Sequence, residues 1–155
     1  MKIKVKQLII ALAIPLAVGG LSTLLSGGMG DYRTFNQPPL SPPGWVFPIV
    51  WTILYLLMGY SSYRVYTSDK PQEYKNRALR FYGAQLLLNF IWPILFFAFD
   101  WYLAAFFLLI SLWILIFLTF KAFSAIDETA GDLLIPYLLW VTFAGYLNLG
   151  VYFLN

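Results

Sequence analysis

The chain has 155 residues, of which 61% are hydrophobic and 11% are charged, and its mean hydropathy is +0.73. These values lie outside the range of soluble domains and predict an integral membrane protein. Cysteine and histidine are absent, which excludes disulfides, thiolate nucleophiles, an imidazole base and Cys or His metal sites. We therefore expect no metal site. The sequence pI near 9.1 is explained by basic residues flanking apolar runs, so we expect no nucleic-acid partner.

The first apolar run, about 7–27, follows a basic segment that contains Lys2, Lys4 and Lys6. This layout resembles a signal peptide. The run is long for that role, however, and no clear cleavage site follows it before Asp31. We expect a retained helix, with processing near the following glycines as the alternative.

The loop 28–43 leads into the second run, about 45–66, through a segment rich in proline and tryptophan. Pro42 and its neighbour keep the incoming chain extended, whereas Pro48 is tolerated in the first turn of a helix. Trp45 is expected at the level of the lipid headgroups. Below it, helical spacing predicts one aromatic stripe made of Phe47, Trp51, Tyr55 and Met58.

The third and fourth runs, about 80–99 and 101–122, are separated only by Asp100. A single helix across both would be about 60 Å long, twice the hydrocarbon thickness, so we expect a tight hairpin at Asp100. Pro93 is expected to kink the third helix because it removes a backbone hydrogen bond. One face of this helix carries Gln85, Asn89, Trp92 and Phe96.

The fifth run covers about 133–154, where a polar, small or aromatic residue recurs every fourth position: Pro136, Trp140, Ala144 and Asn148. The apolar runs together predict an all-α fold, an integral membrane bundle of five transmembrane helices that forms a single domain over residues 1–155.

The basic residues predict the orientation of the bundle. Nine of the 10 Lys and Arg residues fall on the side that holds the N-terminus and the connections near 67–80 and 121–132, and Arg33 lies on the other side. Because cytoplasmic loops carry the excess of basic residues, we expect the N-terminus in the cytoplasm and the C-terminus outside, most simply in the cell membrane. The loop 28–43 then faces away from the cytoplasm.

Three tryptophans, Trp51, Trp92 and Trp140, are candidates for the walls of a flat, apolar cavity inside the bundle. Such a cavity suits a planar aromatic ligand, held by ring stacking and a few hydrogen bonds. The alternative is that each stripe only packs helices together, as amides and small residues commonly do in membranes. Ion transport is disfavoured because charged residues in the spans lie only near their ends.

Three blocks, at 42–55, 89–97 and 136–148, closely resemble the motifs of the tryptophan-rich sensory protein family. This family includes the mitochondrial translocator protein, also called the peripheral benzodiazepine receptor. The resemblance implies a five-helix membrane protein, often a homodimer, with an intrabundle pocket capped by the loop 28–43. Family members bind porphyrins such as protoporphyrin IX and haem, benzodiazepine-site ligands and, in animals, cholesterol.

The resemblance also implies roles for particular residues. Tyr32 matches a loop aromatic that reaches toward the pocket, and Ala144 matches a small residue whose size governs ligand fit. Trp51 and Trp140 match tryptophans associated with light-dependent porphyrin oxidation, and these two would be the catalytic residues if that activity is present. The expected ligand-binding residues are Tyr32, Pro42, Phe47, Trp51, Tyr55, Asn89, Trp92, Pro93, Phe96, Trp140, Phe143, Ala144 and Leu147.

Three functions follow from these observations. The leading one is a receptor or sensor that binds a tetrapyrrole or another flat apolar ligand, without a required cofactor. Haem would lack its commonest axial ligands here, so a metal-free porphyrin or weakly ligated haem is favoured. Light-dependent porphyrin degradation and transport of porphyrin or lipid-like molecules are the alternatives. Sterol recognition is not expected, because Leu149 and Tyr152 are followed by no basic residue.

Overall fold

The computed structural model describes residues 3–27 and 36–155, and within these residues the regular structure is helical. Five helical segments are long and apolar enough to cross a membrane, which confirms the predicted all-α bundle. The elements are α1 (Val5–Leu25), α2 (Val46–Tyr66), α3 (Gln72–Pro93), the π-helical turn η2 (Ile94–Ala98), α4 (Tyr102–Ile126), the short α5 (Glu128–Asp132) and α6 (Ile135–Leu154).

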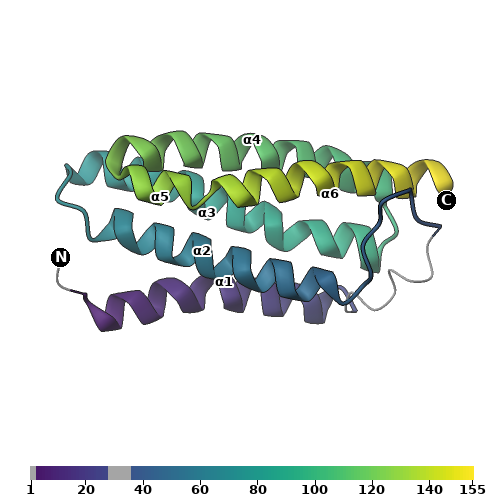
Figure 1. Cartoon of the computed structure of the whole chain (residues 1–155), viewed down its shortest axis with the longest axis horizontal. Helices are drawn as coiled ribbons and strands as arrows, with labels where there is room; N and C mark the ends of the chain where they lie inside the picture. The colour runs from purple at the N-terminus through teal and green to yellow at the C-terminus, as the bar shows by residue number, and fades with distance from the viewer. Residues whose placement is uncertain (1–2, 28–35) are drawn as a thin grey trace.

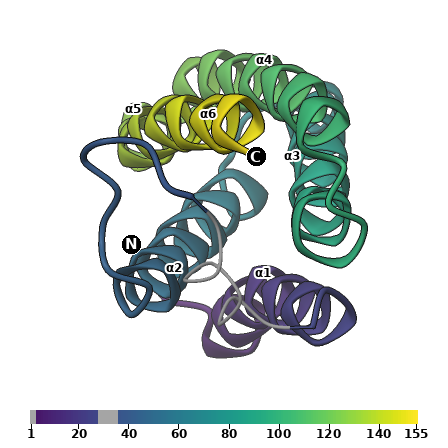
Figure 2. The same ribbon diagram turned by 90° about the vertical axis from the view of Figure 1, so that its right-hand side faces the viewer.

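The helices run roughly along one axis, and the view along that axis shows how they surround the centre (Figure 1, Figure 2). Helix α4 packs on both α3 and α6, whereas α1 packs on α2 and α3. Helices α2 and α6 face each other mainly through large side chains, such as Trp51 and Tyr137, whose ring centroids are 6.2 Å apart. The most buried side chains include Met58, Ile116 and Phe123.

The predicted hairpin between the third and fourth spans is present. The chain leaves its helix after Ala98 and starts the next one at Tyr102. Asp100 has a φ of 56°, in the left-handed region that Asp tolerates better than most residues. The single charge in this long apolar stretch therefore marks the place where the chain reverses.

Pro93 ends the regular part of α3 rather than simply bending it. Directly after this proline, residues Ile94–Ala98 form a π-helical turn, and the Phe99 amide donates to the Ile94 carbonyl at 3.2 Å, five residues earlier. Proline lacks an amide hydrogen and crowds the preceding turn, which explains why the hydrogen-bond pattern changes at this point.

The helix bounds differ from the predicted ones mainly at the end of the bundle where α1 starts. The third helix begins at Gln72, not near residue 80, and the fourth continues to Ile126, not 122. The fifth span starts with the separate helix α5, and α1 is displaced by two residues from the predicted 7–27. Counting apolar residues finds only the hydrocarbon-spanning part, whereas helical hydrogen bonding continues into polar sequence.

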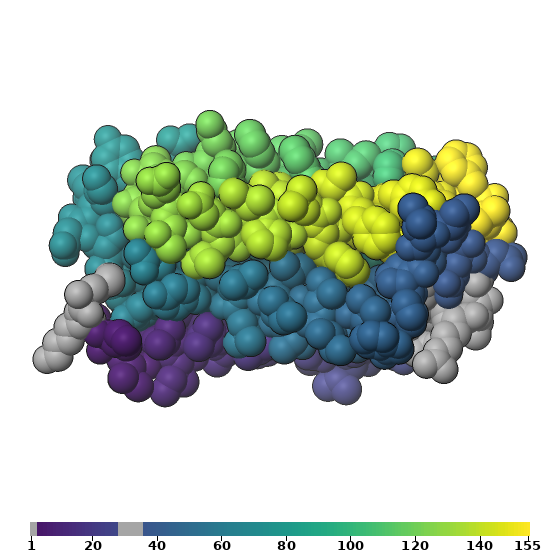
Figure 3. Space-filling model, viewed as in Figure 1, coloured from purple at the N-terminus to yellow at the C-terminus, as the bar shows by residue number. Residues whose placement is uncertain are grey.

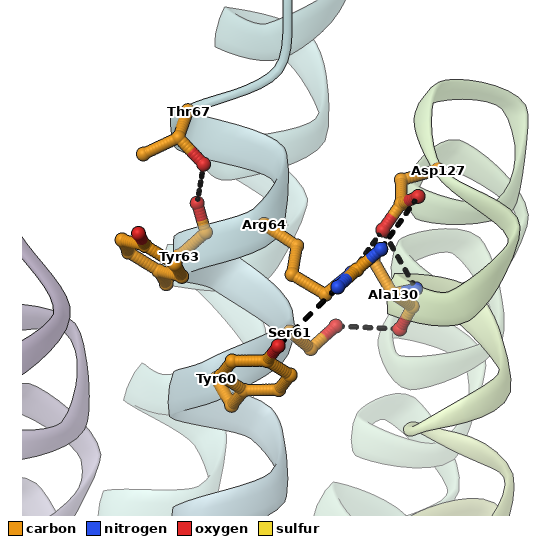
Figure 4. A network of polar contacts seen from close by, with 7 residues as sticks. All are labelled: Tyr60, Ser61, Tyr63, Arg64, Thr67, Asp127 and Ala130. Carbon is orange, nitrogen blue, oxygen red and sulfur yellow. Dashed lines mark hydrogen bonds and ion pairs between the residues drawn. The ribbon is translucent and has the colours of Figure 1, made fainter. Parts of the chain in front are cut away.

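A polar cluster joins α2 to α5 at this same end (Figure 4). The Arg64 guanidinium donates to both carboxylate oxygens of Asp127, and Ser61 donates to the Ala130 carbonyl. Asp127 also caps α5, since its side chain accepts from the Ala130 amide at 3.2 Å. The Arg64 guanidinium holds the pKa of the Asp127 carboxyl below its usual range.

At the opposite end, the described part of the long loop, residues 36–45, lies against the last turns of α6 (Figure 1, Figure 3). The Tyr146 hydroxyl donates to the Pro39 carbonyl at 2.6 Å. The Asn155 side chain donates to the Asn36 carbonyl at 3.0 Å and accepts from the Asn36 amide at 3.3 Å. These bonds fasten the loop to α6, over the end of the bundle that contains the aromatic stripes.

Candidate functional site

Side chains from three helices meet in one aromatic pocket beneath this loop. Helix α2 supplies Phe47 and Trp51, α3 with its π-helical turn supplies Trp92, Phe96 and Phe97, and α6 supplies the opposite wall. The pocket is lined by Phe47, Trp51, Trp92, Phe96, Phe97, Trp140, Ala144, Leu147 and Asn148. Seven of the predicted ligand-binding residues, Phe47, Trp51, Trp92, Phe96, Trp140, Ala144 and Leu147, are thereby brought together.

The rings of this pocket pack closely against one another. Trp92 stacks on Phe96 with centroids 5.0 Å apart, and Phe47 meets the Trp140 ring edge-on at 5.9 Å. The space left between the side chains is only about 20 Å³. Ligand pockets usually measure about 300–1,000 Å³, so this space is far too small for a ligand. The pocket is therefore closed in this conformation.

Two of the three indoles that line the pocket, Trp92 and Trp140, differ in their hydrogen bonds. Trp92 Nε1 donates to Asn148 Oδ1 at 2.9 Å, and Asn148 Nδ2 donates onward to the Tyr102 carbonyl at 2.8 Å. Trp140 Nε1 is buried and has no acceptor among the described residues. A buried donor without a partner costs free energy, so an acceptor that reached Trp140 Nε1 would gain a hydrogen bond.

A buried polar network lies next to the pocket and holds α2, α3 and α6 together. The Tyr55 hydroxyl donates to Asn89 Oδ1 at 3.1 Å, and Asn89 Nδ2 donates to the Tyr137 hydroxyl at 2.6 Å. Tyr137 in turn donates to Gln85 Oε1 at 2.7 Å. Because every one of these groups has a partner, the network is satisfied without a ligand.

Two further predicted residues, Tyr55 and Asn89, belong to this network and not to the pocket lining. Pro93 is buried one residue after Trp92, where α3 ends. Phe143 lies beside Trp140, with centroids 5.6 Å apart, and faces a shallow groove between α2 and α6. Pro42 is half-buried in the loop and does not line the pocket. Tyr32 lies outside the described residues.

Sequence reasoning did not single out Phe97 or Tyr137. Phe97 follows Phe96 directly, and two adjacent residues of an α-helix do not share a face. Both belong to the π-helical turn, and both line the pocket. Tyr137 is fully buried and shares helical spacing with Ala144 and Asn148, a signal that the four-residue repeat beginning at Pro136 concealed.

A second, open recess of about 540 Å³ lies between α1 and α2 at the same end of the bundle. Its lining includes Gly19, Gly20 and Thr23 of α1 and Trp45, Trp51 and Tyr55 around α2. A Cβ on Gly19 would overlap the Tyr55 ring, so only glycine permits this approach. Among the described residues, Trp51 is the one that lines both the closed pocket and this recess.

Comparison with known proteins agrees with this architecture. The TspO/MBR family model matches residues 11–154. The chain is 40% identical over 124 residues to the tryptophan-rich protein TspO of Chlorobaculum tepidum, covering 80% of this chain and 78% of that protein. It is 39% identical to the tryptophan-rich sensory protein of Cereibacter sphaeroides, with 80% and 76% covered. It is 35% identical to the translocator protein of Bos taurus, with 78% and 72% covered.

Proposed function

Because this chain belongs to the TspO/MBR family, a family of membrane proteins of sensory or translocator type, we propose that it binds a tetrapyrrole in the aromatic pocket between α2, α3 and α6. The observation that carries the proposal is the convergence of seven predicted residues on one pocket. The N–H of Trp140, which has no partner among the described residues, adds a donor for a polar edge of the ligand. Benzodiazepine-site ligands, which are also flat and apolar, fit the same chemistry.

Room for the ligand would be made by a movement of the Trp51 side chain. The closed pocket is far too small for a macrocycle, but Trp51 is the shared wall between it and the recess of about 540 Å³ beside α1. A change in the Trp51 side chain would join the two spaces and expose Trp140 to the ligand. The satisfied network behind Trp51 would stay in place and act as a rigid floor.

Metal-free protoporphyrin IX suits this site better than haem. The chain contains no His or Cys, the commonest axial ligands of haem iron. Ring stacking and hydrogen bonds to the macrocycle do not require the metal. We therefore expect binding that does not depend on iron.

Binding is tested by titrating the detergent-purified protein with protoporphyrin IX and following the quenching of tryptophan fluorescence. Saturable quenching at micromolar ligand is expected. Ala144→Thr, which adds two heavy atoms to the closed pocket, should weaken binding about tenfold or more through overpacking. Ala13→Thr on the exposed side of α1 is the matched control and should bind normally. Absence of saturable quenching, or equal affinity in all three proteins, rules this site out.

Light-dependent oxidation of bound porphyrin is the second candidate. It is favoured by the position of Trp51 beside two phenols, with centroid distances of 5.7 Å to Tyr55 and 6.2 Å to Tyr137. The bound pigment would absorb the light and pass its energy to dioxygen, and the excited dioxygen would add across a double bond of the macrocycle, so that dioxygen is reduced as the porphyrin is oxidised. These rings would hold the pigment in place. Illumination should bleach bound porphyrin faster than free porphyrin, and Trp51→Phe and Trp140→Phe should slow it. If the complexes of the wild type and both variants bleach at the rate of free porphyrin, the protein binds the pigment but does not promote its oxidation.

We also propose that the N-terminal end of the bundle faces the cytoplasm and the loop 36–45 faces outward, supported by the distribution of Lys and Arg. The absence of native cysteine makes the test direct. A membrane-impermeant thiol reagent should label Ser41→Cys, but not Lys6→Cys, in intact cells. The opposite pattern reverses the orientation. A homodimer is a further expectation, tested by the molar mass of the protein in detergent.

A further inference from the structure

A recess of about 520 Å³ lies between α3 and α4 at the end of the bundle opposite the aromatic pocket. The first turns of α3 and the last turns of α4 meet there, at the same end as the start of α1 (Figure 1). It is lined by Lys70, Pro71, Tyr74, Arg77, Phe81, Leu118, Lys121, Ala122, Ala125 and Ile126.

Three cations from three elements line this recess. Lys70 lies in the connection after α2, Arg77 on α3 and Lys121 on α4. None of the described residues that line the recess is acidic, and the ion pair found within the described part of the chain, Arg64 with Asp127, involves none of these cations. Glu73 lies one turn before Arg77 but forms no ion pair with it. The recess therefore carries a local positive charge that the described side chains do not neutralise.

The remaining walls are apolar. Phe81 and Leu118 belong to the membrane spans, and Ala122 and Ala125 leave room between the helices because their side chains are small. The Arg77 guanidinium lies 5.7 Å from the centroid of the Phe81 ring, at the boundary between the charged rim and the apolar floor. Polar and apolar lining thus follow one another along the axis of the bundle.

We propose that this recess binds the headgroup of an anionic phospholipid, with Lys70, Arg77 and Lys121 around the phosphate and the start of an acyl chain on Phe81 and Leu118. Three cations that form no ion pair with a described residue match a phosphate, and an apolar floor continuous with the spans matches a lipid rather than a free anion. The proposed site differs from the general attraction of basic residues to anionic membranes, because that attraction does not need a recess between two helices. This proposal is independent of any ligand in the aromatic pocket.

The full-length protein in mild detergent is titrated with phosphatidylglycerol, with phosphatidylcholine of the same acyl chains, and with inorganic phosphate, while its thermal unfolding midpoint is measured. Phosphatidylglycerol should stabilise the wild-type protein at concentrations about tenfold lower than phosphatidylcholine does. Inorganic phosphate should have little effect. Equal stabilisation by the two lipids, or by inorganic phosphate and phosphatidylglycerol, overturns the proposal.

Two triple variants distinguish lipid binding in this recess from attraction by the total positive charge of the protein. The variant K70Q/R77Q/K121Q should require roughly 10- to 100-fold more phosphatidylglycerol than wild type. The matched variant K4Q/K6Q/R80Q removes the same charge from exposed positions outside the recess and should keep most of the preference. An equal loss in both variants would show that the preference follows total charge, and the proposal would fail.

A third variant tests the shape of the recess at unchanged charge. Ala125 is exposed, so Ala125→Trp can fill the recess without disturbing the buried core. It should abolish the preference for phosphatidylglycerol, whereas Ala104→Trp, at an exposed position elsewhere on α4, should not. If Ala125→Trp keeps the full preference for phosphatidylglycerol, the lipid does not bind in the recess. This conclusion holds even if the triple variant fails to fold.

Discussion

The indoles of Trp92 and Trp140 line the same pocket but should respond differently to replacement by phenylalanine. Trp92→Phe breaks the hydrogen bond to Asn148 and should destabilise the protein by about 1–2 kcal/mol. Trp140→Phe removes a buried donor that has no partner among the described residues, which offsets part of the lost packing. Thermal unfolding in detergent should therefore show a larger loss for Trp92→Phe. A larger loss for Trp140→Phe would mean that its N–H is paired.

For single residues, Asn89 shows that helical spacing predicts the face of a side chain but not its hydrogen-bond partner. Helical periodicity correctly placed Asn89 and Trp92 on one side of α3, but it could not show which partner each would meet. The structure pairs Asn89 with Tyr55 and Tyr137, while Trp92 reaches Asn148 and the pocket. Which side chains meet depends on how α2, α3 and α6 are positioned relative to one another along the bundle axis. The spacing of residues within one helix does not determine that position.

At the scale of elements, adjacent glycines of α1 offer a matched pair. A Cβ at Gly19 would overlap the Tyr55 ring, whereas a Cβ at Gly20 meets nothing within 4 Å. Gly19→Ala should therefore separate α1 from α2 and destabilise the protein by about 1–3 kcal/mol, as overpacked sites do. Gly20→Ala should be neutral or slightly stabilising, because alanine favours helix. Thermal unfolding of the two variants decides this, and equal midpoints would show that Tyr55 can move aside freely.

The contact between α2 and α5 should make stability depend on pH in the acidic range. Because Arg64 lowers the pKa of Asp127 in the folded protein, the contact contributes fully above the unfolded pKa, near 4, and is lost as the pH falls below it. Asp127→Asn should remove about 1–2 kcal/mol at neutral pH and flatten part of the acid response. Unfolding midpoints from pH 7 to pH 3 measure both effects. Arg64→Gln should behave like Asp127→Asn, and an unchanged acid response in both would contradict the assignment.

The helices themselves were largely predictable, because a bilayer imposes both length and composition on its spans. The hairpin at Asp100 followed from length alone. The early start of α3 did not, since residues 72–77 are mostly polar and carry the helix beyond the apolar run, with Gln72 hydrogen-bonded to Asn76 one turn later. The separate helix α5 depends on the Asp127 cap, which hydropathy does not detect.

At the scale of the whole molecule, the two ends of the bundle differ in chemistry. One end holds the closed aromatic pocket beneath a loop fastened to α6, and the other holds the basic recess and the Arg64–Asp127 contact. The sequence predicted most of the aromatic side chains that gather at the first end. It did not predict that these rings would pack together and fill the pocket. Closure depends on the packing of rings from three helices, which residue spacing cannot supply.

The bond between the loop and α6 should control access to the pocket. Tyr146→Phe removes the hydrogen bond to the Pro39 carbonyl while keeping the ring. It should speed association and release of protoporphyrin IX several-fold, with a smaller change in affinity, because the loop must move in both directions. Stopped-flow fluorescence measures these rates. Tyr152→Phe, another exposed tyrosine near the end of α6, is the control, and identical rates in both variants would mean that the ligand does not pass this loop.

The π-helical turn after Pro93 has a consequence for how this chain can vary in length. Its wider ring holds one residue more than an α-helical turn needs, so a single-residue deletion within Ile94–Ala98 can be absorbed by restoring the α-helical pattern, without shifting the hairpin at Asp100. The cost would fall on Phe96 and Phe97, which could no longer both reach the pocket. Deletion of one residue from this turn could thus alter ligand preference while the five membrane-spanning helices keep their positions.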